Sequence, residues 1–402
     1  MKKTTTLLLL LLICLLPQAA WGDDPTYTAN GVTWKYGLVG PWGAWKVEIR
    51  GETMGAANFS GALNIPDVIP HNGTNYPVGQ IASSAFANYT NATAVTIPNS
   101  VTKIEWAAFT NSGITSVTLP NNSSLSIAGG AFEGCNRLTS LTIPDAVPTT
   151  TFAGTYSGGS PLKNCKGLVS VTVPNSWTTI PDFFLQGCEN VTNFTLPAGI
   201  TKIGDNAFNG CKKLLHVDAS AATGLTEIGN NAFYRSGLME PLLPNGLTTV
   251  GSSAFSYCPN ISQVTIPNSI TNFGYGIFAS CEGLTNATIP STMTSVPNRL
   301  FSLCRNLLHC NLPIGLISIE EEAFYDCKNL TEDLTALTHI TSFQNRAFCG
   351  CEKLTGHLTF HAGTQTIGLE AFKNCTGITG TLTFPEGLQT IGDAAFEGCT
   401  GI

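Results

Sequence analysis

The sequence predicts a β-rich solenoid, a right-handed superhelix of about 14 stacked units of ~23 residues with short strands and helical turns. Three observations support this prediction. The dipeptide Ala-Phe recurs at a nearly constant spacing, a strand-like pattern ending in Pro follows most recurrences, and each unit is too small to fold alone.

The recurring Ala-Phe dipeptide marks one position in each unit, which we call the anchor. Its phenylalanines are Phe86, Phe109, Phe132, Phe208, Phe233, Phe255, Phe324, Phe348, Phe372 and Phe396. Phe278 and Phe301 occupy the anchor position after Ile and Leu instead of Ala. Leu162 and Leu185 occupy the anchor position in two further units. The fourteen anchors are mostly 22–25 residues apart, with one interval of 30 residues after Phe132.

The consensus unit is I-P-x-x-(V/I/L)-T-x-I-x-x-x-A-F-x-x-C-x-x-L-x-x-(L/V)-T-(I/L)-P. Its L-x-x-L-T-I segment alternates as a short strand does, with apolar residues inward and Thr outward. Pro ends the strand because it has no N–H to donate to the ladder. The A-F-x-x-C segment favours a tight helical turn on the opposite wall. A unit buries about five apolar side chains, too few to offset the entropy of ordering it, so units must stack.

The first 22 residues have the features of a signal peptide. Lys2 and Lys3 precede an apolar stretch at residues 7–16 that is too short to span a bilayer, and Ala20 and Gly22 favour cleavage before Asp23. No later stretch predicts a transmembrane segment. The sequence therefore predicts an exported protein, at the cell surface or in the extracellular space.

Composition excludes several classes of function. Apolar residues make up 43% of the chain and charged residues only 11%, which argues against disorder. Removing Lys2 and Lys3 leaves 17 basic and 26 acidic residues, a net charge of −9. Nucleic acids need a cationic face, so we expect no nucleic-acid partner.

The two ends of the chain lack the regular repeat. Residues 23–64 predict an N-terminal β cap with strands at 32–36 and 44–49 and a third over 61–65. A carbohydrate-binding patch of Trp34, Trp42 and Trp45 is an alternative for this segment. The solenoid is predicted over residues 65–402. It stops at Ile402 in the middle of a repeat, from which we expect a C-terminus truncated from a longer product.

From about residue 61 onward the repeated I-P-x-x-V-T-x-I, A-F-x-x-C and L-x-x-L-T-I-P motifs resemble the BspA-like, Treponema-type, leucine-rich-repeat proteins. These proteins are common on Bacteroidetes and spirochaete surfaces and in some protists. The resemblance implies a solenoid displayed at the surface. It also implies adhesion to host matrix or plasma proteins, or to other cells.

Eleven cysteines follow the anchors by three residues: Cys135, Cys165, Cys188, Cys211, Cys258, Cys281, Cys304, Cys327, Cys351, Cys375 and Cys399. Stacking brings their Cα atoms within disulfide range, but parallel side chains hold the Cβ atoms too far apart. Ser112 and Ser236 continue the same column and could not accept a bond. We expect buried free thiols, with Cys349, directly behind Phe348, as the exposed exception.

No pattern in the sequence predicts catalysis. The six histidines are scattered, and neither a nucleophile elbow, a phosphate loop, a calcium loop nor a zinc-binding spacing occurs. We therefore expect a non-enzymatic protein without cofactor or metal.

The outward strand position is the most informative column for recognition. Thr occupies it in most units, including Thr265 and Thr288, which is also what a solvated sheet face needs. The companion column is irregular, which argues against ice binding. We expect ligand contacts at these two threonines and at the distinctive polar residues His216, Asp218, His309 and Asn311.

The longest insertion, residues 145–161, adds Phe152 and Tyr156 as candidate contacts, with a tolerated bulge as the alternative. Taken together, these features predict an adhesin that binds extracellular proteins of matrix, plasma or cell-surface type through the solenoid face. The alternative is a glycan-binding or structural component of a surface layer.

Overall fold

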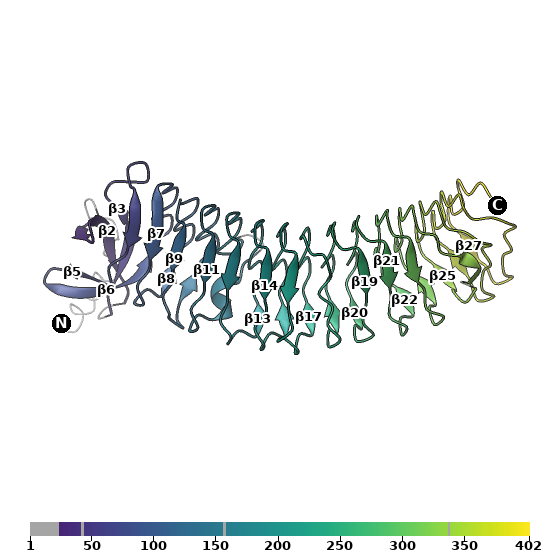
Figure 1. Cartoon of the computed structure of the whole chain (residues 1–402), viewed down its shortest axis with the longest axis horizontal. Coiled ribbons are helices and arrows are strands. Elements are labelled where there is room, and N and C mark those ends of the chain that lie inside the picture. Colours follow the sequence, from purple (N-terminus) through teal and green to yellow (C-terminus); the bar gives the residue numbers. More distant parts are fainter. Residues whose placement is uncertain (1–23, 42–43, 156–157, 337) are drawn as a thin grey trace, which may run out of the picture.

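The computed structural model describes residues 24–41, 44–155, 158–336 and 338–402. The chain forms one elongated, gently curved rod, with the cap strands at one end and β27 (Thr390–Ile391) at the other (Figure 1). Coils follow one another in sequence order, so each coil touches mainly its neighbours. The predicted solenoid is confirmed, with about 13 turns and almost no helix.

The N-terminal strands are built into the solenoid. Strands β1 (Thr26–Ala29), β2 (Val32–Val39) and β3 (Lys46–Glu52) form an antiparallel sheet. β3 then pairs in parallel with β6 (Thr74–Ile81), the second strand of a hairpin with β5 (Val68–His71). This sheet therefore continues directly into the first coils, and Trp34 on β2 packs against the anchor Phe86.

One wall of the rod is a column of short parallel strands with outward Thr or polar residues, which we call the strand face. Its members are β4 (Gly61–Asn64), β7 (Ala92–Thr96), β9 (Ser116–Thr118), β11 (Ser140–Thr142), β12 (Ser170–Thr172), β14 (Asn193–Thr195), β16 (His216–Asp218), β19 (Gln263–Thr265), β21 (Asn286–Thr288) and β23 (His309–Asn311). Residues 61–65, expected as a cap strand, supply β4, which pairs with β7 as the first strand of this face.

A second wall continues from β6 as two-residue parallel strands, which we call the second sheet. These strands are β8 (Lys103–Ile104), β10 (Ser126–Ile127), β13 (Thr179–Ile180), β15 (Lys202–Ile203), β17 (Glu227–Ile228), β18 (Thr249–Val250), β20 (Asn272–Phe273), β22 (Ser295–Val296), β24 (Ser318–Ile319), β25 (Ser342–Phe343), β26 (Thr366–Ile367) and β27.

The anchors lie on the third wall, which we call the turn wall. The N–H of an anchor donates to the carbonyl just before the next anchor, as Phe233 does to Ala254 at 2.8 Å. The predicted helical turns are chains of non-helical turns instead, because two residues around each anchor have positive φ, such as Ala107 and Asn111 beside Phe109. Two short 3-10 helices, η1 (Thr149–Phe152) and η2 (Leu334–Ala336), are the only helices in the described residues.

The anchor side chains form the spine of the core. Phe208, Phe233, Phe255 and Phe278 are buried and stack with ring centroids 5.2–5.5 Å apart. The cysteine column runs beside them, and each thiol donates to the carbonyl of the preceding anchor, as Cys281 does to Phe255 at 3.1 Å. All thirteen cysteines of the described residues are free and buried, which confirms the prediction of core thiols.

Two predictions about individual side chains are wrong, and burial also removes one residue from the alternative carbohydrate patch. Phe152 is fully buried, because the insertion folds inward and packs its ring against Trp177 and Phe184 where the anchors are the smaller leucines. Cys349 is buried as well, at 8% exposed, rather than facing solvent. Trp34 is buried against Phe86 and donates to the Ala29 carbonyl, so it cannot form a carbohydrate patch.

Of the three other residues named in these predictions, the structure describes only one. Trp45 is 39% exposed, whereas Trp42 and Tyr156 lie outside the described residues, as does the predicted signal peptide.

Candidate recognition site on the strand face

Between β4 and β23 the ladder of the strand face is divided into four short sheets, and at one of the breaks a coil lacks its strand altogether. Residues 238–244 occupy the place of a strand between β16 and β19 but form none. The sequence Leu-Met-Glu-Pro-Leu-Leu-Pro puts Pro241 where neighbouring coils have the inward Val217 and Val264. Proline has no N–H to donate to a ladder, so β14–β16 and β19–β21–β23 end as separate sheets on either side.

Two shallow grooves flank this interruption, each with a volume of about 500 Å³. The first, the Asp218 groove, is lined by residues 216–220, Leu238 and residues 240–244. The second, the Thr265 groove, is lined by Asn245, residues 265–269, residues 288–291 and Asn311. The two grooves share no lining residue, but Pro244 at the edge of the first is followed in the chain by Asn245 at the edge of the second.

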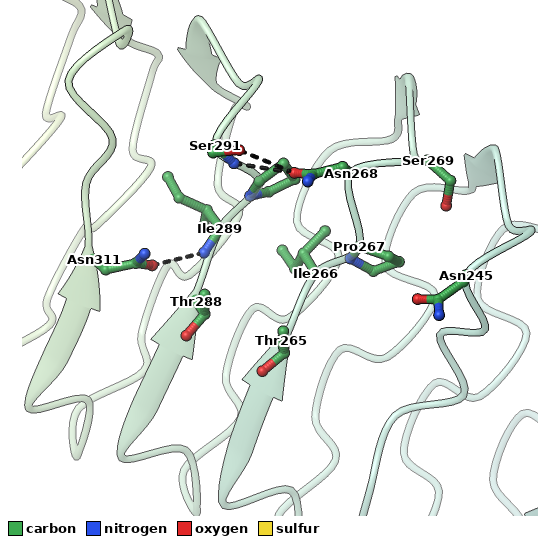
Figure 2. A pocket seen from close by; sticks show the side chains of 11 residues that line it. Asn245, Thr265, Ile266, Pro267, Asn268, Ser269, Thr288, Ile289, Ser291 and Asn311 are labelled. Carbon is green, nitrogen blue, oxygen red and sulfur yellow. Dashed lines mark hydrogen bonds between the residues drawn. The ribbon is translucent and has the colours of Figure 1, made fainter.

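The strands fix the geometry of the Thr265 groove. Thr265, Thr288 and Asn311 are register partners on β19, β21 and β23, and all three side chains are exposed (Figure 2). Asn311 accepts the Ile289 N–H through Oδ1 at 2.9 Å, and Asn268 accepts the Ser291 N–H at 3.1 Å. The Ser269 hydroxyl oxygen is buried and has no hydrogen-bond partner among the described residues.

The Asp218 groove carries the charged groups. The N–H of Ser220 donates to Asp218 Oδ1 at 2.9 Å and lowers the pKa of this carboxyl group, so it is ionised at neutral pH. His216 precedes it on the same exposed side of β16. Glu240 lies across the groove on the interrupted coil.

Apolar side chains are exposed beside the interruption. Leu215 is 44% exposed and Met239 is 57% exposed, and the Met239 N–H donates to the Leu215 carbonyl at 3.2 Å. Elsewhere this column mostly carries Thr or Ser. Val169 and Leu308 are also exposed in this column, but only here do two neighbouring coils both carry an exposed apolar residue, which makes the surface half apolar and half polar.

The predicted contacts are distributed unevenly over this surface. His216 and Asp218 line one groove, and Thr265, Thr288 and Asn311 line the other. His309 lies on β23, exposed and 3.7 Å from Glu332, but outside both linings. Leu215, Met239 and Pro241 were not predicted from the sequence, although Pro241 stands where the neighbouring units have an inward strand residue.

The described residues offer little for catalysis or metal binding. They contain no group of three or more His, Cys, Asp or Glu side chains placed to hold a metal ion. Burial raises the pKa of most core thiols, for example that of Cys188 to about 12, which disfavours the nucleophilic thiolate. None of the described helices is long and apolar enough for a membrane span.

Stacked coils of this length with strands on one wall and an anchor spine define a leucine-rich-repeat solenoid. Within that class, the chain belongs to the family described as the BspA type leucine rich repeat region, whose model matches residues 52–157, 158–240, 226–355 and 341–402. The resemblance predicted from the repeats is thus confirmed.

Solved structures with the same fold come from other bacteria. A leucine-rich repeat protein from Bacteroides ovatus is 23% identical, with 94% of this chain and 93% of that chain covered and a TM-score of 0.66. A leucine rich cell surface protein from Faecalibacterium prausnitzii is 22% identical, covering 93% and 96%, with a TM-score of 0.50. The pneumococcal vaccine antigen PcpA is 16% identical, covering 92% and 94%, with a TM-score of 0.52.

None of the curated proteins shows significant similarity to the chain. The solved structures support the fold, which is typically a non-enzymatic binding scaffold.

Proposed function

We propose that the protein is an exported adhesin that binds an extracellular protein of matrix, plasma or cell-surface type through the two grooves of the strand face. The observation that carries this proposal is the pair of exposed apolar residues Leu215 and Met239 on neighbouring coils, which directly precede the groove residues His216 and Glu240. Protein interfaces combine an apolar centre with a polar rim in this way.

Further features support binding at the surface rather than chemistry. The signal-peptide pattern of residues 1–22 favours export, and one structural relative is described as a cell surface protein. A rigid scaffold presents its contacts without an ordering cost on binding.

The experiment is a surface-binding assay of residues 23–402 against fibronectin, fibrinogen, laminin, collagen and polysaccharides. We expect at least one protein to bind. The double variant Thr265→Arg/Thr288→Arg should weaken binding at least tenfold, because two long charged side chains would fill the groove.

The matched control carries the same two charges on the second sheet, as Thr249→Arg/Asn272→Arg on the paired strands β18 and β20. Its affinity should stay within about twofold of the unmodified protein. Equal losses in both variants would contradict the assignment to the strand face. Binding to a polysaccharide without any protein ligand would contradict the adhesin and favour the surface-layer alternative.

A further inference from the structure

The turn wall carries an aromatic and cationic cluster, which we call the Tyr-Arg cluster, formed by Tyr234, Arg235 and Tyr257. The guanidinium carbon of Arg235 lies 5.3 Å from the ring centroid of Tyr234 and 5.2 Å from that of Tyr257. The two rings are 5.3 Å apart at an interplanar angle of 65°. Both rings therefore hold the same cation in place by cation–π attraction.

The charge of Arg235 is not compensated by a carboxylate. Among the described residues, Arg50, Arg299, Arg305 and Arg346 each form an ion pair with Asp or Glu. Arg235 forms none and is exposed, although the chain has a net charge of −7. In the described part of the chain, Arg137 is the other exposed arginine without such a pair, and no aromatic ring there lies against its guanidinium. Arg235 alone is thus a positioned cation with free N–H donors.

Two residues of the cluster have an unfavourable backbone conformation. Arg235 and Tyr257 stand two residues after their anchors, with φ of 56° and 58°. In ten of the fourteen coils this position holds Gly, Asn or Asp, which tolerate positive φ better than other residues. The four exceptions are consecutive coils, and the first two carry the cluster. Unfavourable backbone conformations of this kind are often retained where a side chain serves recognition.

The aromatic surface continues onto the next coil. Tyr257 is 44% exposed and Tyr275 is 59% exposed. Their coils are hydrogen-bonded, because the Tyr257 N–H donates to the Ala279 carbonyl and the Ser253 N–H to the Tyr275 carbonyl. Tyr257, which contacts the cation, and Tyr275 on the next coil therefore both present exposed rings on the turn wall.

We propose that the Tyr-Arg cluster binds an acidic saccharide, independently of the strand face. A guanidinium with free donors recognises a carboxylate through two parallel hydrogen bonds. A pyranose ring offers an apolar face of C–H groups that packs on an aromatic ring. A uronic-acid residue carries both groups on one small ring, so it fits a cation held between exposed tyrosines better than an acidic peptide, which offers charge without the stacking face.

The test is titration calorimetry of residues 23–402 with an unsulfated hexasaccharide of alternating glucuronate and N-acetylglucosamine. We expect binding that weakens as salt is raised, and at least tenfold weaker binding by a neutral hexasaccharide or a hexaglutamate peptide. Failure of the acidic hexasaccharide to bind at millimolar concentration would overturn the proposal. Equally tight binding of the peptide would overturn the choice of a saccharide.

Variants locate the site. Arg235→Gln and Tyr257→Ser should each weaken binding of the acidic hexasaccharide at least tenfold. Arg235→Asn gives a second test with a residue that other coils accept at this position, should the Gln variant fold poorly. Arg137→Gln removes the same charge from an exposed site and should change affinity less than twofold. Unchanged affinity in Arg235→Asn would refute the assignment.

Discussion

At the scale of single residues, each cysteine of the column has two roles: its side chain fills space in the core, and its thiol donates a hydrogen bond. Each column thiol donates to an anchor carbonyl, as Cys188 does to Leu162 at 3.3 Å and Cys258 to Phe233 at 3.1 Å. Ser112 and Ser236 substitute for the thiol in two coils, and each lies within 3.4 Å of the next Sγ in the column. A small residue with a weak donor is what this position requires.

These thiols make stability depend on pH. Burial raises the pKa of Cys188 to about 12 and that of Cys258 to about 11, from 9.0. The folded state thus excludes the thiolate while the unfolded chain allows it, so the stabilisation is complete below pH 9 and is lost as pH rises above it. We expect each of these two thiols to lower the free energy of unfolding by about 1 kcal/mol between pH 8 and pH 10.

Urea unfolding of residues 23–402 at several pH values measures this loss. The variant Cys188→Ala/Cys258→Ala should lose about 2 kcal/mol less than the unmodified protein over the same pH interval. Identical pH profiles for the two proteins would contradict burial of these thiols in the folded state.

Side chains in the repeat could be predicted from the sequence, and those outside it could not. The anchors and column cysteines recur in a fixed phase, so one interpretation accounts for all of them. Phe152 belongs to no repeat, and the composition of the insertion around it suggested a surface loop. Only the packing deficit at Leu162 and Leu185 explains why an aromatic ring from the insertion enters the core.

At the scale of elements, side chains as well as strands join neighbouring coils. Asn268 Oδ1 accepts the Ser291 N–H of the next coil at 3.1 Å, and Asn99 accepts the Asn121 N–H in the same way at 2.8 Å. Each of these side-chain amides accepts a hydrogen bond from a backbone N–H group that lies beyond the Pro at the end of a strand. Such an N–H group has no partner in the strand ladder.

The variant Asn268→Ala tests this connection. It should lower the free energy of unfolding by about 1–2 kcal/mol, because the Ser291 N–H loses its partner. The control is Asn245→Ala, since Asn245 occupies the matching loop position one coil earlier and makes no hydrogen bond among the described residues. Its unfolding free energy should stay within about 0.5 kcal/mol of the unmodified protein. Chemical denaturation measures both, and equal losses would contradict the proposed role of Asn268.

The candidate site illustrates the limits of prediction at this scale. The outward column identified Thr265, Thr288 and Asn311 because a strand alternates strictly. The groove beside them depends on a missing strand at Pro241, and the depth of a surface depends on how neighbouring coils separate. A repeat consensus carries no such information, which is why Leu215 and Met239 were missed.

At the scale of the whole molecule, stacking determines both shape and function. Fourteen anchors give thirteen intervals, and with strands about 4.8 Å apart the solenoid is roughly 62 Å long before the cap is added. The repeat period alone predicts this architecture, since no unit can bury its apolar side without neighbours. A rod separates its walls, so the strand face and the Tyr-Arg cluster can be tested by independent variants.

Small-angle X-ray scattering of residues 23–402 tests the stacked architecture most directly. A rod about 80–90 Å long, solenoid and cap together, predicts a radius of gyration above about 25 Å and a pair-distance distribution with an extended tail. A compact domain of this length would give about 21 Å and a symmetric distribution. The second result from a monodisperse monomer would contradict the solenoid and every surface assigned to it.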